Sequence, residues 1–197
     1  MGREPNASGQ TKDIEFRPFY QLHRRTYATY WDVFTPSDWE AQRVVYADEA
    51  ERRRRLEAAT IAYLEPGETV FEREFNYQAG PDTQTQRMMG RPGRRGRSWF
   101  SYDIPVDGSH PMTLLATYYS EDRRGTPAEF AVLVDGQRVA MQSLRLSDPP
   151  RFFDVEYAIE PALVARKQKV TVRFEAVEGN QIATVFALRM IRADAPR

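Results

Sequence analysis

From Trp99 to the end of the chain, short stretches of alternating apolar and polar residues follow one another, with turn residues between them. Gly, Pro, Asp and Ser separate the stretches, and short strands at such regular spacing are typical of an antiparallel β-sandwich. We therefore expect a mainly β fold in which residues 61–193 form one sandwich domain. The stretches are WFSYDIPV, MTLLATYYS, AEFAVLVDG, QRVAMQSLRL, RFFDVEYAI, KVTVRFEAV and IATVFALRMI.

Within the sandwich, Asp135 and Gly136 carry the clearest local signal. They stand between two alternating apolar runs, and a type I′ hairpin needs a positive φ at both of its central residues. A short helical turn is expected at Pro161, ahead of a later strand. Because side chains alternate between the two faces of a strand, two apolar sets should each share one face: Phe130, Val132 and Val134, and Val170, Val172 and Phe174.

The first 34 residues differ from the rest of the chain. Residues 1–13 are polar and are expected to form a disordered tail. Residues 14–34 are rich in aromatic side chains and are expected to form an extended aromatic strand. This segment is too apolar to be left in water, so it should pack on the sandwich or on a partner.

A linker helix is predicted over residues 35–60. Thr35 suits the N-cap, Pro36 suits the first helical position, and the residues that follow contain no Gly or Pro up to position 59. Residues 79–98 combine turn residues with low apolar content and are interpreted as a long exposed loop. Between the helix and this loop, residues 74–78 (EFNYQ) are a candidate first strand.

Composition excludes several classes of function. Lys plus Arg and Asp plus Glu both total 28, so the net charge is zero and no general attraction to nucleic acid or to an anionic membrane is expected. Cysteine is absent, which removes a disulfide framework, a thiolate zinc site and a cysteine nucleophile. The N-terminus lacks the apolar stretch of a signal peptide, and no window is apolar enough to span a bilayer. As it stands, the chain is expected to be cytoplasmic.

The sequence contains no recognisable catalytic motif. The two histidines, His23 and His110, belong to no Ser-His-Asp or metal-ligand pattern. Pairs of acidic residues occur, but a glycosidase needs two carboxyl groups at a fixed separation across a cleft, which a sequence does not define. We expect a chain that is no enzyme, with no metal ion and no cofactor.

Two arginine-rich stretches could indicate an anionic partner. Arg52–Arg55 fall on the predicted helix, where glutamates three and four residues away favour ion pairs along a solvated face. In the second stretch, residues 87–97, Arg94, Arg95 and Arg97 are candidates for binding a phosphate or a carboxylate. No aromatic residue is interleaved with these arginines, so a surface loop is the simpler interpretation and nucleic acid is not expected.

Aromatic residues are the remaining candidates for a binding site. Ligand sites commonly combine aromatic side chains with a few well-placed polar groups, and sugars stack their apolar faces on such rings. Trp99, Tyr118 and Tyr119 are the candidate carbohydrate-binding residues. Tyr118 and Tyr119 are adjacent in a predicted strand and therefore point to opposite faces, so one of them must avoid a core that lies on one side only.

The order and spacing of several motifs agree with those of a known family. They are PFYQLHRRTYATYWDVF, the Ala/Glu/Arg-rich helix, GRSWFSYDIPVD, MTLLATYYSED, FAVLVDGQRVA, FFDVEYAIEPALVARKQKVTVRFEA and VFALRMIR. Together they resemble the C-terminal part of glycoside hydrolase family 127, the β-L-arabinofuranosidase group, over residues 14–192. The resemblance implies a jelly-roll-like β-sandwich preceded by a linker helix and by the last strand of another β-domain. That family's catalytic barrel, with its zinc-bound cysteine nucleophile, has no counterpart here, so no catalytic residue carries over.

The leading hypothesis is therefore a non-catalytic accessory β-sandwich module of a carbohydrate-active enzyme. It would brace a catalytic glycoside hydrolase module or chain, in cis or in trans, or that module's substrate entrance. A first alternative is a stand-alone carbohydrate-binding module with a plant-type glycan as its ligand. A second alternative is a polyanion-binding protein that uses residues 87–97.

Overall fold

The computed structural model describes residues 34–120, 128–144 and 150–194. The chain divides into two compact units, Met1–Val45 and Tyr46–Arg197. In the first unit the described residues comprise the beginning of one helix, and in the second they comprise the rest of that helix and all of the strands. The predicted tail, and all of the predicted aromatic strand except Phe34, lie outside the described residues.

Helix α2 (Pro36–Ala59) confirms the predicted helix and its cap. The Thr35 hydroxyl oxygen accepts a hydrogen bond from the backbone N–H of Asp38 at 3.2 Å, which satisfies one of the free donors of the first turn. In the second unit, Glu51 forms ion pairs with Arg54 and Arg55. The four consecutive arginines are therefore exposed on a solvated helix, and two of them pair with Glu51, as expected from their spacing.

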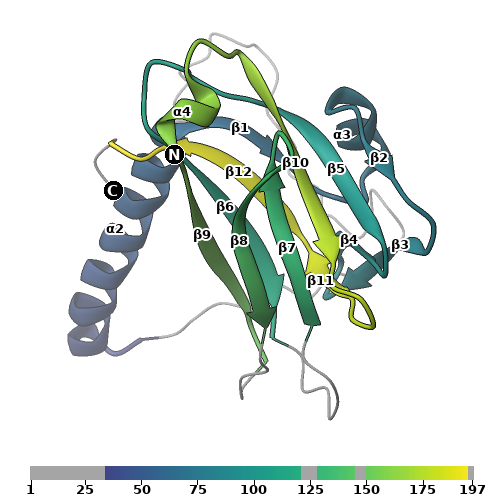
Figure 1. Cartoon of the computed structure of the whole chain (residues 1–197). Coiled ribbons are helices and arrows are strands. Elements are labelled where there is room, and N and C mark those ends of the chain that lie inside the picture. Colours follow the sequence, from purple (N-terminus) through teal and green to yellow (C-terminus); the bar gives the residue numbers. More distant parts are fainter. Residues whose placement is uncertain (1–33, 121–127, 145–149, 195–197) are drawn as a thin grey trace, which may run out of the picture. The chain divides into compact units, whose positions relative to one another are not determined.

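Two antiparallel sheets form the body of the second unit (Figure 1). Sheet A has the order β1-β12-β6-β9, and sheet B has the order β2-β5-β10-β7-β8. The strands of sheet A are β1 (Thr60–Leu64), β12 (Ala187–Arg192), β6 (Met112–Tyr119) and β9 (Phe152–Ile159). The strands of sheet B are β2 (Gln78–Ala79), β5 (Trp99–Pro105), β10 (Lys169–Ala176), β7 (Ala128–Val134) and β8 (Gln137–Leu144).

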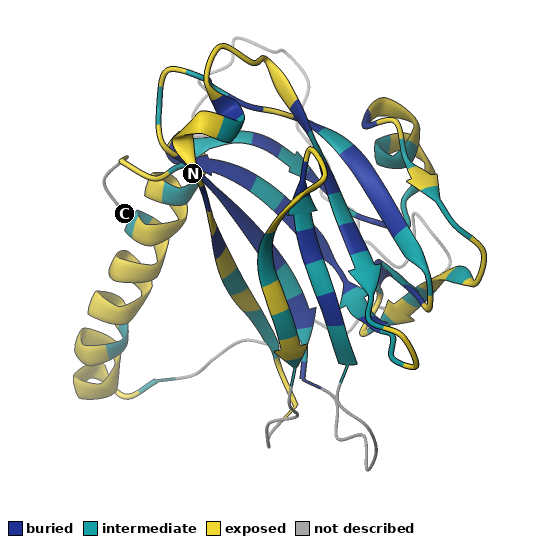
Figure 2. Ribbon diagram, viewed as in Figure 1, coloured by how far each residue is buried: buried dark blue, intermediate teal, exposed yellow. Residues whose placement is uncertain are grey.

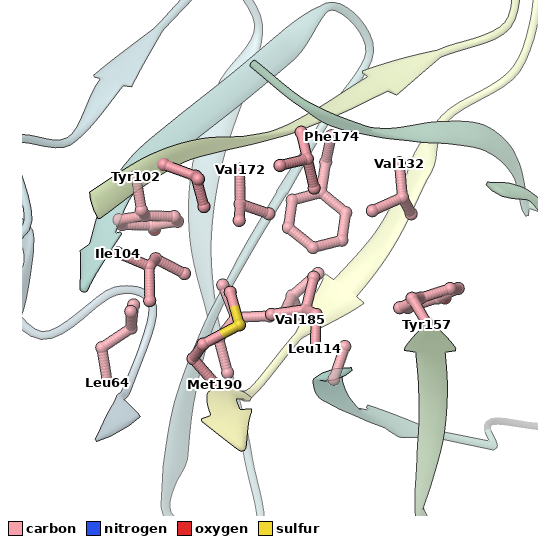
Figure 3. Close-up of a cluster of buried hydrophobic side chains, with 14 of the residues drawn as sticks. Leu64, Tyr102, Ile104, Leu114, Val132, Tyr157, Val172, Phe174, Val185 and Met190 are labelled. Carbon is pink, nitrogen blue, oxygen red and sulfur yellow. The ribbon is translucent and has the colours of Figure 1, made fainter. Parts of the chain in front are cut away.

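The hydrophobic core lies between these two sheets, so the predicted antiparallel β-sandwich is confirmed. Buried and less buried residues alternate along the strands (Figure 2), because each strand turns every second side chain toward the opposite sheet. The two apolar sets predicted for β7 and β10 are all buried in this core. Figure 3 shows side chains of sheet B facing those of sheet A, among them Tyr102, Val172, Phe174 and Val132 on one side and Leu64, Leu114 and Met190 on the other.

The predicted turns are also confirmed. Asp135 and Gly136 have φ values of 48° and 81°, so both central residues of the β7–β8 connection adopt the left-handed conformation that a type I′ turn requires. The turn fixes the register at its base, where Val134 pairs with Gln137. The helical turn expected at Pro161 is the short helix α4 (Pro161–Val164).

The prediction of a long exposed loop over residues 79–98 is wrong. This stretch contains strands β3 (Thr83–Met88) and β4 (Arg91–Gly96), which pair as a hairpin. With β11 (Ile182–Val185) they form a third sheet, sheet C, in the order β11-β4-β3. The polar sequences TQTQRM and RPGRRG lack apolar alternation, and the burial in β4 comes from Pro92, Gly93 and Gly96.

The candidate first strand over residues 74–78 is also largely wrong. Glu74 ends helix α3 (Thr69–Glu74), and only Gln78 enters a strand, the two-residue β2. Phe75 is buried in the sandwich core. Its apolar side chain therefore packs from the end of a short helix and not from the predicted strand.

Candidate functional site

Tyr118 is wrong as a candidate carbohydrate-binding residue. Its side chain points into the sandwich and is 0% exposed. Its hydroxyl lies 2.9 Å from the Tyr157 hydroxyl, which in turn donates a hydrogen bond to the Gln142 side-chain oxygen at 3.0 Å. Burial raises the pKa of Tyr118 well above its ordinary value. The residue is a satisfied polar group of the core, with no surface to offer a ligand.

Trp99 lies on the outer face of sheet B, at the start of β5. It is directly opposite Glu175 on β10, while its neighbour Phe100 points into the core. The Arg173 guanidinium lies 4.1 Å from the centroid of the Trp99 ring and forms an ion pair with Glu175. One face of the indole is therefore occupied by a charged side chain of the same sheet, which leaves less of the ring for a sugar to stack on.

Tyr119 lies on the outer face of sheet A, opposite to the side into which Tyr118 points. Its direct partner across the sheet is Phe152 on β9, and the two ring centroids are 4.9 Å apart. The next pair on the same face is Thr117 and Asp154, whose side chains share a hydrogen bond of 2.6 Å. A partly exposed ring, a second ring, a hydroxyl and an exposed carboxylate thus lie together on two neighbouring strands.

Arg91 adds a positive charge to this group. It stands at the start of β4, and its guanidinium lies 4.5 Å from the centroid of the Phe152 ring. Phe152 also meets Phe186 edge to face at 5.1 Å, and Phe186 is buried. We call the five residues Thr117, Tyr119, Phe152, Asp154 and Arg91 the Tyr119 face.

The Tyr119 face has unused hydrogen-bonding capacity. Within residues 34–120, 128–144 and 150–194, no hydrogen bond reaches the Tyr119 hydroxyl and no carboxylate lies within ion-pair distance of Arg91. A phenol can donate and accept, a carboxylate accepts, and a guanidinium donates in a planar fork. Apolar rings beside such groups are the chemistry that a hydroxyl-rich, ring-shaped ligand requires.

The three arginines predicted to bind anions do not form one site. Arg94 and Arg95 are consecutive in β4 and therefore point to opposite faces of the hairpin, and Arg97 lies beyond the end of the strand. Arg94 is paired with Glu72, and Arg95 donates hydrogen bonds to Gln86 and Gln181. A continuous polyanion-binding patch would need these charges on one surface.

His110 takes part in a polar cluster at the end of β12. Its Nδ1 lies 3.0 Å from an Asp194 carboxylate oxygen, and its Nε2 lies 3.7 Å from Asp107. Asp107 also binds Arg192 and the Ser109 hydroxyl. The Ser109 hydroxyl donates to Asp107 and not to the imidazole, so this serine is not placed as a nucleophile with His110 as its base.

Metal-binding clusters and membrane-spanning helices are both absent from the described part of the chain. No group of three or more His, Asp or Glu side chains is placed there to hold a metal ion. None of the helices described is both long enough and apolar enough to cross a bilayer.

The sequence identified Tyr119 but not the residues around it. Phe152 belongs to the predicted stretch RFFDVEYAI, and Arg91 belongs to the arginine-rich residues 87–97. Their contact joins two strands from different sheets, so the spacing of residues along the chain does not predict it. The alternation of β6 and β9, once their register is known, would have placed Asp154 beside Tyr119.

Comparison with solved structures finds partial similarity to this chain. A family 35 carbohydrate-binding module from Clostridium thermocellum is 12% identical, with a TM-score of 0.46 over 67% of this chain and 99% of that chain. The GH26-CBM35 β-(1,4)-mannanase of Podospora anserina is also 12% identical, with a TM-score of 0.46 over 71% of this chain and 29% of that chain. The ANX1 ectodomain of Arabidopsis thaliana is 14% identical, with a TM-score of 0.45 over 66% of this chain and 40% of that chain.

The sequence has no match among curated proteins. One family model does match, over residues 55–191, and it is described as a family of unknown function, DUF6805. The match begins in the last turns of α2 and ends in β12, so it takes in both large sheets and the hairpin of sheet C. Because it covers more than half of the chain, this protein belongs to the DUF6805 family.

Proposed function

We propose that this chain is a non-catalytic accessory module of a carbohydrate-active enzyme and that it binds glycan through the Tyr119 face. The observation that carries the proposal is the Tyr119 ring, which is partly exposed beside Phe152 with its hydroxyl unbonded within the described residues. Asp154 and Arg91 supply an acceptor and a donor next to the rings. Stacking would give the affinity, and the polar groups would select the orientation of the sugar.

A rigid support makes the Tyr119 face suitable for this role. Tyr119 and Phe152 belong to adjacent strands of a four-stranded sheet, and Tyr118, between Thr117 and Tyr119, is anchored in the core. A ligand would therefore find its contacts already in place, and binding would cost little conformational entropy.

The enzyme that this module would serve is a family 127-type glycoside hydrolase, which the motif resemblance favours. The module would brace the catalytic module or its substrate entrance, with the Tyr119 face in contact with the same glycan. The proposal assigns no catalytic residue to this chain. Release of arabinose from arabinosides by the purified chain alone would overturn this part of it.

The test is a binding titration of the purified chain with a panel of plant-type oligosaccharides. We expect binding of at least one of them, and roughly tenfold weaker binding by Tyr119→Ala, because loss of a central ring contact typically costs more than 1 kcal/mol. The matched control is Met141→Ala, since Met141 is an exposed residue of β8 in sheet B and does not belong to the Tyr119 face.

Three outcomes would overturn the proposal. The first is no binding of any oligosaccharide at millimolar concentration. The second is binding that survives Tyr119→Ala unchanged. The third is binding that is lost in Trp99→Ala but retained in Tyr119→Ala, which would place the site on sheet B instead.

A further inference from the structure

We infer that the ligand of the Tyr119 face is an acidic sugar, whose carboxylate is bound by Arg91 while its ring stacks on Tyr119. This inference rests on the proposed function and specifies its ligand class. It is carried by the contrast between Arg91 and two other arginines of the β3–β4 hairpin, Arg87 and Arg94, and by the way Arg91 is held.

Two other arginines of the hairpin have their charge neutralised within the chain. Arg87 forms an ion pair with Glu68 at 3.1 Å, and Arg94 forms one with Glu72 at 2.6 Å. Arg91 has no such carboxylate among the residues that the structure describes. Its guanidinium keeps its donors available, and their planar fork matches the two oxygens of a carboxylate.

Arg91 is nevertheless held in one place by aromatic contacts. Its guanidinium lies over the Phe152 ring, and Phe152 meets the buried Phe186. The hairpin that carries Arg91 packs closely on the same ring, because a Cβ at Gly93 would come within 3.0 Å of a Phe186 ring carbon. A cation fixed in this way loses little side-chain freedom when it binds a ligand.

The charge of Arg91 also has a small effect on Tyr63 in β1. Burial raises the pKa of Tyr63 to about 12, a hydrogen bond to Glu65 adds to this shift, and the nearby charges of Arg189 and Arg91 oppose it. A ligand carboxylate over this face would meet a positive field from the hairpin side.

Asp154 is a nearby group that would oppose such a ligand. Its carboxylate accepts a hydrogen bond from the Thr117 hydroxyl, one residue pair away from Tyr119 and Phe152 along the strands. Like charges repel, so Asp154 would weaken binding of an anion and would leave binding of a neutral sugar unaffected or improved. This gives the inference a second residue with a predicted effect of opposite sign.

The experiment compares two oligosaccharides that differ only in one sugar, neutral in the first and a uronate in the second. With the unmodified chain at low salt, the uronate form should bind roughly tenfold more tightly, since a charge-assisted bidentate pair is stronger than a neutral hydrogen bond. The advantage should disappear in Arg91→Met, which keeps an apolar stem on Phe152. It should be reduced but not lost in Arg91→Lys, which keeps the charge without the fork.

Two further variants complete the design. Asp154→Asn should strengthen binding of the uronate form several-fold. The preference for the uronate form over the neutral form should still depend on Arg91. Arg97→Gln is the matched control, because Arg97 is an exposed arginine of the same segment that lies outside the Tyr119 face. Circular dichroism melting curves verify that each variant is folded.

Each outcome either supports or overturns the inference. Equal binding of the two oligosaccharides, both dependent on Tyr119, overturns the acidic ligand and leaves the proposed function standing. No binding of either form overturns the proposed function itself. A uronate preference that survives Arg91→Met, or that Arg97→Gln abolishes equally, overturns the assignment to Arg91. If a sulfated analogue binds more tightly than the uronate, the inference that the acidic group of the ligand is a carboxylate is overturned.

Discussion

The Arg94 guanidinium forms a two-pronged ion pair with the Glu72 carboxylate. Its Nε and Nη2 donate to Glu72 oxygens at 2.9 and 2.6 Å, and a second Nη2 contact to the other oxygen measures 2.7 Å. The backbone N–H of Gly67 donates to the same carboxylate at 2.9 Å. The pair joins helix α3 to strand β4, and the two side chains are only 12% and 14% exposed.

Removal of one partner of this pair should be much more damaging than removal of both. Glu72→Gln would leave the Arg94 charge in a partly buried position, and we expect a loss of about 3 kcal/mol in the free energy of unfolding. The double variant Glu72→Leu with Arg94→Met should lose less than Glu72→Gln alone, since it removes the uncompensated charge. Urea denaturation measures both.

The exposed pair in helix α2 provides the matched control for this experiment. Glu51→Gln breaks contacts with Arg54 and Arg55 on the solvated face and should cost about 0.5 kcal/mol or less. If Glu72→Gln costs no more than Glu51→Gln, the Glu72–Arg94 pair is not a structural link between α3 and β4.

The buried pair of Tyr118 and Tyr157 gives a prediction about which hydroxyl donates the hydrogen bond between them. Tyr157 donates its hydroxyl proton to Gln142, so Tyr118 must be the donor in the bond between the two hydroxyls. Tyr157→Phe would leave the fully buried Tyr118 hydroxyl without an acceptor and should cost about 1–3 kcal/mol. Tyr118→Phe leaves Tyr157 bonded to Gln142 and should cost about 1 kcal/mol. The opposite order in thermal or urea unfolding would contradict this network.

The same pair should make the protein sensitive to alkali. Burial raises the pKa of Tyr157 to about 12, although its bond with Tyr118 acts in the other direction. A group whose pKa is raised in the folded state contributes stability that is fully present below its unfolded pKa, near 10, and is lost as the pH rises. We therefore expect the free energy of unfolding to fall between about pH 10 and pH 12, and to fall less steeply in Tyr157→Phe. Equal slopes for the two proteins would be evidence against a buried, protonated Tyr157.

The His110 cluster gives a prediction on the acid side. The pKa of Asp194 lies below its ordinary value mainly because His110 hydrogen-bonds to its carboxylate, whereas the pKa of Asp107 is lowered mainly by the Ser109 hydroxyl. A lowered carboxyl pKa means that the contact stabilises the fold above about pH 4 and is lost as the pH falls. His110→Ala should raise the pKa of Asp194 and leave that of Asp107 still below its ordinary range. A carboxyl NMR titration measures the two groups separately. An unchanged pKa of Asp194 in His110→Ala would disprove the effect of His110 on that carboxyl group.

The large sheets could be predicted because their residues alternate. In β7, Phe130, Val132 and Val134 repeat every second position, and the sequence therefore specified both the strand and the face that it buries. The Asp135-Gly136 turn then set the register of β8. Where the local pattern of apolar residues agrees with the burial, the sequence is sufficient to predict the strand and its buried face.

The binding residues needed information that the sequence does not contain. Tyr118 and Tyr119 are equally aromatic, and only the location of sheet B relative to β6 decides which of them is buried. Arg91 and Phe152 meet because the hairpin of sheet C packs beside sheet A. Such long-range contacts follow from the packing of sheets, which has no signature in residue spacing.

The hairpin was not predicted because its strands lack apolar alternation, and the close packing at Gly93 gives a last prediction. A Cβ at Gly93 would lie 2.6 Å from a Thr184 methyl carbon and 2.9 Å from the Val185 carbonyl oxygen. Gly93→Ala should therefore cost about 1–3 kcal/mol, as overpacking of a tight contact does, and should disturb the position of Arg91.

Replacement of the neighbouring methyl separates the two contacts at Gly93. Thr184→Ser removes that methyl group, so it should recover part of the stability that Gly93→Ala loses. The recovery should be incomplete, because the Val185 carbonyl belongs to the backbone and cannot be removed. Full recovery in a double-variant unfolding cycle would show that the methyl alone limits the site, and a cost below about 0.5 kcal/mol for Gly93→Ala would show that the hairpin can move away. Either result would weaken the case that Arg91 is held rigidly over Phe152, on which the acidic-ligand inference depends.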